Sequence, residues 1–243
     1  MERRHGWVSG RLPRGREIVN FYQRTVAILH KDLRAEWRTK ERLSPMVFFV
    51  LLVLLVFNFS FELGGAALHE IGPGVLWSSY VFASLLSLNR TFAAESENGS
   101  LDGLLLAPGD RSALYLGKML GNLIFLLAVQ LLSLPFFALF FNLSIGFYLW
   151  PLLLVFLFGS SSLAAVGTLF AAMSNNMRLR ELLLPLLLLP LILPAVLSCV
   201  ASTAAVLAQN QGEKLYIHLQ MLGVYTLVFA VLSFLLFEYV IEE

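Results

Sequence analysis

The sequence predicts an all-α membrane protein with six transmembrane helices, preceded by an amphipathic helix that lies on the membrane surface. Of its 243 residues, 58% are hydrophobic and 14% are charged, against about 45–50% and about 25% in ordinary soluble domains. The apolar residues fall in long runs, and eleven of the seventeen Lys and Arg residues precede the first run. Together these observations favour a polytopic membrane protein with a basic N-terminal segment.

The N-terminal segment divides into a tail and a helix. Residues 1–16 form a basic tail, which we expect to be attracted to anionic lipid. From residue 17 onward, apolar residues recur at spacings of three or four, which places them on one stripe of an α-helix. The stripe comprises Ile18, Tyr22, Val26, Leu29, Leu33 and Trp37. We therefore predict an amphipathic interfacial helix over residues 17–44, lying on the cytoplasmic leaflet and ending before Ser44-Pro45.

Six apolar runs follow, each close to the roughly 20 residues that a helix needs to cross a bilayer. The second run is short unless its helix begins within the turn expected at Gly72-Pro-Gly74. We expect the runs to form one membrane domain over residues 45–243. The runs are Met46–Leu63, Gly74–Asn89, Ala113–Phe141, Tyr148–Met173, Leu182–Leu207 and Leu219–Ile241.

The basic residues also predict the orientation of these helices, because Lys and Arg are enriched in cytoplasmic loops. The N-terminal segment is therefore expected in the cytoplasm, and six crossings return the C-terminus there. No cleavable signal peptide is expected, since more than forty residues precede the first run. The loops after the second and fourth runs agree with this orientation, with Arg90, Arg111, Arg178 and Arg180.

Prolines and small residues inside the runs predict local bends and close helix contacts. Pro135 lies in the third run, and three prolines lie in the fifth, so these helices are expected to bend where a backbone donor is missing. Gly117 and Gly121 form a G-x-x-x-G pattern, which brings helices together either within one chain or across a dimer. The prolines of the fifth run are Pro185, Pro190 and Pro194.

Ionisable residues inside the runs would indicate a path for ions or protons, because each costs about 2.5–3.5 kcal/mol to insert. The runs contain almost none. Lys118 and Glu238 lie near the cytoplasmic ends of their runs, where we expect their side chains to snorkel to the interface. This pattern disfavours a proton-coupled carrier.

Motifs of catalytic and metal sites are missing. Gly117-Lys118 is followed by methionine and does not form a P-loop, so we predict that the chain is not an enzyme and does not hydrolyse ATP itself. The single Cys199 is expected to be a small packing residue. His69 and His218 are of a type that ligates haem, but a lone interfacial histidine is more commonly a surface residue. We therefore predict no metal and assign no cofactor to this chain.

A loop of different composition separates the second and third runs. Residues 92–108, with the sequence FAAESENGSLDGLLLAP, contain three acidic residues and no Lys or Arg. Asn98-Gly99 is a turn signal that precedes a helix-like run from Ser100 to Leu106. A short surface helix at this place is what a membrane subunit requires to receive force from a cytoplasmic motor protein.

Several stretches around this loop carry a resemblance to a known family. Their order and spacing resemble the CcmB family, the membrane permease of the cytochrome c maturation haem exporter. With Ala35–Arg38 (AEWR) and the six-run layout, the resemblance extends over the chain from about residue 25 onward. The stretches are Ile71–Trp77 (IGPGVLW), Leu88–Phe92 (LNRTF), Glu95–Asp102 (ESENGSLD) and Leu104–Pro108 (LLLAP).

The resemblance implies a type-2 ABC exporter fold, in which two copies of the permease pair with two copies of a separate ATPase, CcmA. Residues 93–106 would form a coupling helix seated in a groove of the ATPase. The resemblance further implies CcmC and CcmD as partners in the bacterial inner membrane, and a role in haem delivery to a periplasmic haem chaperone. Two alternatives stay open: haem itself passes through the permease, or ATP use only releases the loaded chaperone from CcmC. The coupling helix would use Leu101, Leu104 and Leu105 as apolar anchors and Glu95, Glu97 and Asp102 as polar contacts.

Three functions remain open at this point. The first is the permease of the haem exporter. The second is a type-2 ABC permease for another substrate, such as a lipid, drug or glycan, which would share the coupling loop. The third is a membrane assembly scaffold that transports nothing, for which the same loop would be a docking surface.

Overall fold

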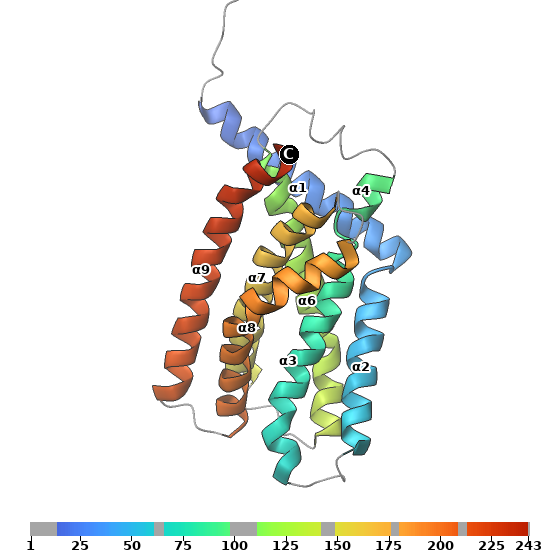
Figure 1. Cartoon of the computed structure of the whole chain (residues 1–243), viewed down its shortest axis with the longest axis vertical. Coiled ribbons are helices and arrows are strands. Elements are labelled where there is room, and N and C mark those ends of the chain that lie inside the picture. The colour runs from blue at the N-terminus through green and yellow to red at the C-terminus, as the bar shows by residue number, and fades with distance from the viewer. Residues whose placement is uncertain are drawn as a thin grey trace, which may run out of the picture.

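The computed structural model describes residues 14–60, 66–97, 111–141, 149–175, 180–208 and 213–242, and the regular elements in these ranges are all α-helices (Figure 1). They form an upright bundle with one helix lying across its end. The helices are α1 (Arg14–Thr39), α2 (Leu43–Ser60), α3 (Ala66–Leu88), α4 (Ala93–Glu97), α6 (Ser112–Phe140), α7 (Leu149–Ser174), α8 (Arg180–Leu207) and α9 (Glu213–Glu242).

Six of the described helices, α2, α3, α6, α7, α8 and α9, are long and apolar enough to cross a membrane. Each corresponds to one predicted run, which confirms the six-helix layout. Figure 1 shows α1, α4 and the end of α9 together at one end of the bundle, which we call the α1 end. An even number of crossings requires α1 and the end of α9 to lie on the same side.

Helix α3 begins earlier than predicted, and the turn expected at Gly72-Pro-Gly74 is wrong. The helix starts at Ala66 and continues through Pro73. Proline removes a single backbone donor, and an apolar span keeps its other backbone groups bonded by staying helical. Gly72 has a packing role, because a Cβ atom there would lie 3.0 Å from the ring of Phe141.

The helices differ in how far they are enclosed. In α3 and α7, 72% of the apolar window is buried, whereas in α9 only 11% is buried. Helix α8 contains Pro185, Pro190 and Pro194, and Figure 1 shows that it first runs obliquely and then turns along the bundle. The predicted bend of this helix is therefore confirmed.

Aromatic side chains and glycine join the middle of the bundle. The rings of Trp77, Tyr80 and Phe156 meet edge to face in pairs, with centroids 5.7–6.0 Å apart. The indole nitrogen of Trp77 donates a 2.9 Å hydrogen bond to Thr203 on α8. A Cβ atom on Gly159 would collide with this indole. The glycine thus allows α7 to approach α3 closely.

Helix α1 lies across the α1 end and packs on α6 (Figure 1). Its predicted apolar stripe is only partly covered by the bundle. Tyr22 is 69% exposed and Trp37 is 86% exposed, whereas Leu29 is half-buried against α6, where a Cβ atom on Gly121 would lie 3.8 Å from it. The exposed part of the stripe remains available to the membrane surface, as an interfacial helix requires. The G-x-x-x-G pattern serves this packing, because a Cβ atom on Gly117 would lie 2.8 Å from the side chain of Ile28.

Candidate functional site at the α1 end

A fully buried lysine lies at the centre of the α1 end. Lys118, on the second turn of α6, is 1% exposed. Its ammonium nitrogen lies 2.5 Å from a carboxylate oxygen of Glu95 on α4 and 3.0 Å from one of Asp32 on α1. It also donates a 2.9 Å hydrogen bond to the carbonyl oxygen of Thr91. The predicted snorkelling of Lys118 is therefore wrong, because two carboxylates compensate its charge inside the protein.

The Lys118 cluster consists of Lys31, Asp32, Thr91, Glu95 and Lys118. Lys31 lies on the open side of the cluster, with its nitrogen 2.5 Å from Glu95 and 3.4 Å from Asp32, and its side chain is 48% exposed. The two lysines and two acids balance in charge. Such compensation is what permits charges to be buried at all, since an isolated buried charge is costly.

The charges of the cluster also determine how its acid and its outer lysine titrate. Burial alone would raise the pKa of the Glu95 carboxyl, but the neighbouring Lys118 and Lys31 ammonium groups lower it to about 2. Burial opposes the charge on Lys31, yet its hydrogen bond to Glu95 and the nearby Asp32 charge leave its pKa raised. Both groups are therefore charged throughout the physiological pH range.

A second set of polar contacts connects the same elements beside the cluster. One carboxylate oxygen of Glu36, on α1, accepts hydrogen bonds from the backbone N–H groups of Arg42 and Leu43, at 3.0 and 2.8 Å. This carboxylate caps the start of α2, where backbone donors have no partner within the helix. The Arg42 guanidinium donates to the carbonyl oxygens of Arg90 and Thr91. Glu36 and Arg42 thus join the connection between α1 and α2 to the turn that follows α3.

A groove of about 950 Å³ opens beside these contacts, between α1, the end of α3, α4 and the start of α8. Charged side chains of both signs line it, among them Lys31, Glu41, Arg42 and Arg90. Arg90 also lies 3.8 Å from Glu41 across this region. The lining is mixed, because apolar residues such as Leu86 and Leu182 lie beside the charged ones.

The structure describes part of the predicted coupling segment, residues 93–106. Helix α4 covers Ala93–Glu97, and the helix-like run from Ser100 to Leu106 lies outside the described residues. Glu95 is 4% exposed and points into the Lys118 cluster. Glu97 is the last residue of α4, and its side chain is outside the described part, as are Leu101, Asp102, Leu104 and Leu105.

The residues that sequence reasoning missed are those that complete this site. Asp32 and Glu36 lie on the buried face of α1 together with Thr25 and Ile28, at spacings of three and four residues. Two acids in register with buried positions, and a lysine inside an apolar run, were the available signals. They did not reveal that these side chains would meet.

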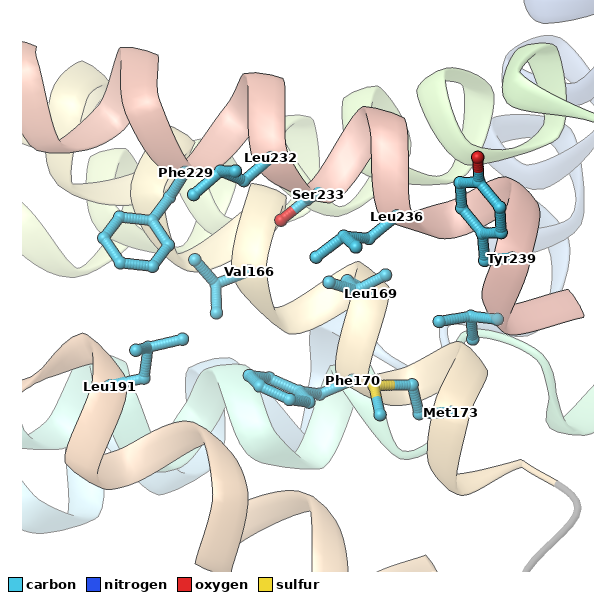
Figure 2. Close-up of a pocket in the computed structure, with 11 residues that line it drawn as sticks. Val166, Leu169, Phe170, Met173, Leu191, Phe229, Leu232, Ser233, Leu236 and Tyr239 are labelled. Atoms are coloured by element: carbon cyan, nitrogen blue, oxygen red, sulfur yellow. The ribbon is translucent and has the colours of Figure 1, made fainter.

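An apolar cavity of about 390 Å³ lies between α7, α8 and α9 (Figure 2). Leu169 and Phe170 approach it from α7, and Leu191 approaches it from α8. Figure 2 shows the hydroxyl group of Tyr239 pointing away from the α7 side. The residues that line the cavity carry no charge, so they offer nothing to pair with an ionised ligand group.

Candidate metal and haem ligands are expected at few positions. Among the described residues, no group of three His, Cys, Asp or Glu residues could hold a metal ion. His218 is half-buried near the start of α9, and Figure 1 shows the start of α9 at the end of the bundle opposite α1. His69 lies near the start of α3, and its side chain is not among those described.

Comparison with known proteins gives consistent matches. The family described as CcmB protein matches residues 23–241. The heme exporter protein B of Rhodobacter capsulatus is 36% identical over 160 residues, which are 66% of this chain and 73% of that protein. The protein of the same name from Paracoccus denitrificans is 34% identical over an equal span and equal shares of both chains. That of Haemophilus influenzae is 27% identical over 159 residues, 65% of this chain and 72% of the relative.

Proposed function

Because the chain belongs to the CcmB family, we propose that it is the membrane permease subunit of an ABC transporter that serves haem export, or haem delivery to a periplasmic chaperone, during cytochrome c maturation. The observation that carries this proposal is the family match over residues 23–241, which includes most of α1 and all six membrane-crossing helices. The names of the relatives, heme exporter protein B, support the substrate.

The proposed machine requires subunits that this chain does not supply. A CcmA-like ATPase would hydrolyse ATP, since the sequence contains no P-loop. CcmC-like and CcmD-like membrane proteins and a second copy of this chain would complete the complex in a type-2 ABC arrangement. Haem would be the substrate, and no haem ligand is assigned within this chain.

The α1 end is the side of the bundle that would face the ATPase in the cytoplasm. Eleven basic residues precede the first span. Helix α4, which is the described start of the predicted coupling segment, lies at the same end of the bundle. Because basic residues favour the cytoplasmic side, we place the α1 end in the cytoplasm and the protein in the bacterial inner membrane. Leu101, Leu104 and Leu105 would anchor the coupling helix, with Glu97 and Asp102 as polar contacts.

Glu95 has a different place in the proposal. Its carboxylate contacts Lys31 and Lys118 inside the protein, so in this structure its Oε1 is already engaged. We propose that Glu95 fixes the start of the coupling segment to α1 and α6 through these two contacts and does not itself contact the ATPase. The polar contacts with the ATPase are then expected chiefly from Glu97 and Asp102.

The test is affinity purification of the chain from its native membrane, with identification of the proteins that accompany it and an absorption spectrum for haem. Recovery of an ATPase together with cytochrome c maturation proteins is the expected result. An ATPase without those proteins would favour a permease for another substrate. Recovery of the maturation proteins with no ATPase would favour an assembly scaffold.

A further inference from the structure

We propose that Lys118 is a positioning residue that transmits displacement of the coupling segment to α1 and to the spans. This inference rests on the proposed function, because it assigns a role to a residue that reaches neither the ATPase nor the substrate. Three elements meet at the ammonium group of Lys118. The Lys118 side chain contacts Asp32 of α1, the turn after α3 through Thr91, and Glu95 of α4.

The first step of the argument is that these contacts do not depend on solvent. Lys118 has no exposed side-chain area, and the side chains of Asp32 and Glu95 are 6% and 5% exposed. Ion pairs in water contribute little and exchange readily, whereas a buried pair is strongly destabilised when one partner is lost. Moving α4 away from Lys118 would leave the Glu95 charge without its buried partner. A joint movement of α4, α1 and α6 costs less free energy, because it keeps the buried ion pairs intact.

The second step follows the contacts into the bundle. The Thr91 hydroxyl donates a 3.1 Å hydrogen bond to Asn122, one turn beyond Lys118 on α6. The Asn122 amide donates a 2.9 Å hydrogen bond to Thr168 on α7. A continuous set of buried polar contacts therefore runs from α4 through α6 to α7. Such chains of paired groups, each holding a definite arrangement, are able to carry coupling between distant sites.

The third step concerns α1. Glu95 contacts Lys31 as well as Lys118, and Lys118 contacts Asp32, so two neighbouring residues of α1 join the cluster. Close packing at Gly117, where a Cβ atom would lie 3.1 Å from the Thr25 carbonyl oxygen, keeps α1 in contact with α6. A displacement received by α4 would thus reach the surface helix and a membrane-crossing helix at the same time.

A merely structural role predicts a different outcome, and a neutral triple variant separates the two. Lys118→Met alone leaves two buried carboxylates and disturbs folding. Combining Lys118→Met with Asp32→Asn and Glu95→Gln removes all three buried charges, and neutral replacement of a buried ionic group is often tolerated. If the charges only hold the fold, the neutral triple variant should work normally. If the charges transmit displacement, the neutral triple variant should assemble with the ATPase but should no longer modulate ATP hydrolysis.

The matched control is Gln130→Met. Gln130 is also buried on α6, and its side-chain oxygen accepts a 2.8 Å hydrogen bond from Ser160 of α7. The substitution removes a buried polar group from the same helix without touching α1 or α4. It should therefore reproduce a general weakening of α6 packing but leave the coupling intact.

The experiment uses the full complex purified from its native membrane. The readouts are the stoichiometry of the ATPase, its ATP hydrolysis rate relative to the isolated ATPase, and the amount of covalent cytochrome c formed in cells. For the neutral triple variant we expect normal stoichiometry and a loss of permease-dependent ATPase modulation and cytochrome c of at least about fivefold, the lower limit of typical allosteric couplings. Gln130→Met should retain both activities.

Hydrogen exchange in the same complexes gives a second readout. With the unsubstituted chain, addition of ATP should change amide exchange in residues 93–97 and in residues 25–36 together. In the neutral triple variant, the change should remain in residues 93–97 alone. A concerted change in that variant would contradict the proposal.

The outcomes separate this inference from the proposed function. If the neutral triple variant assembles and shows full ATPase modulation and cytochrome c formation, the positioning role is overturned and the permease function stands. If Gln130→Met loses as much coupling as the triple variant, the effect is one of general packing and the positioning role is again overturned. Failure of the unsubstituted chain to bring down any ATPase would overturn both.

Discussion

At the α1 end of the bundle, α1, α4 and α6 meet around Lys118, Asp32 and Glu95, whereas in its middle, α3, α7 and α8 meet around Trp77 and Gly159. The first meeting uses buried charges in balanced pairs. The second uses ring contacts, a glycine and neutral hydrogen bonds. The difference follows the cost of burying charge, which is greatest at the centre of a bilayer and lower near its edge.

The comparison also separates two kinds of specificity. Apolar packing consists of many individually weak contacts that have no preferred direction. A buried ammonium group requires its carboxylates at short distance, so it holds three elements in one arrangement. The region beside the predicted coupling segment therefore has the stricter geometry, and the middle of the bundle has the closer packing.

The largest loss of stability is expected when a single charge of the Lys118 cluster is removed. Lys118→Met leaves the buried Asp32 and Glu95 with the half-exposed Lys31 in place of their buried cation, and removal of one partner of a buried pair costs about 3–5 kcal/mol. We expect a corresponding fall in the free energy of unfolding, measured by denaturant titration of the purified chain in detergent micelles. Lys40→Met, at an exposed position, is the control. Equal stability of the two variants would show that Lys118 is not tied to the cluster.

In the middle of the bundle, Gly159→Val should show how strict the apolar packing is. A Cβ atom there would collide with the Trp77 ring and lie 2.7 Å from the Cys199 sulfur atom. Overpacking of this kind typically costs about 1–3 kcal/mol. Gly223→Ala is the matched control, because its Cβ would lie 4.0 Å from the nearest side chain, that of Phe158. Thermal unfolding in detergent should separate the two, and coincident transitions would argue against the Trp77 contact.

A third substitution tests the α1 end from outside the cluster. Leu104→Glu or Leu105→Glu would bury a charge at the proposed apolar contact with the ATPase, and loss of such an anchor commonly costs about 2 kcal/mol or more. We expect the affinity for the ATPase to fall about 30-fold at 2 kcal/mol, while membrane insertion is unchanged. Co-purification measures the first quantity, and carbonate extraction of membranes measures the second. Normal ATPase stoichiometry would count against the coupling role of this segment.

The smallest change in stability is expected from a change of pH. The sign of this change follows from the Glu95 pKa. The folded protein lowers this pKa from 4.5 to about 2, so the charged carboxylate stabilises the fold fully above pH 4.5 and progressively less as the pH falls towards 2. The groups that face it, Lys31, Lys118 and Asp32, are those of the cluster. The stability difference between the unsubstituted chain and Glu95→Gln should therefore be constant from pH 8 to pH 5 and shrink below that. A difference that grows on acidification would contradict the assignment.

Much of the fold could be predicted from the sequence, because membrane-crossing helices are recognised by local composition. All six spans correspond to apolar runs, and the stripe on α1 gave its amphipathic character. The start of α3 was missed, because Gly72-Pro-Gly74 favours a turn in water, whereas an apolar environment favours continued helix. The coupling segment beyond Glu97 stays a prediction.

The sequence by itself determined the features that depend on local composition. These are the number of spans, the amphipathic character of α1, and the position of α1 and the end of α9 at the same end of the bundle. Tertiary structure alone decided the partners of Lys118, since Asp32 and Glu95 are 86 and 23 residues away along the chain. It also decided that Asp32 and Glu36 of α1 turn inward while Tyr22 and Trp37 of the apolar stripe turn outward. The physical reason is that hydropathy is a local property, whereas the charge balance of a buried site depends on every element that meets there.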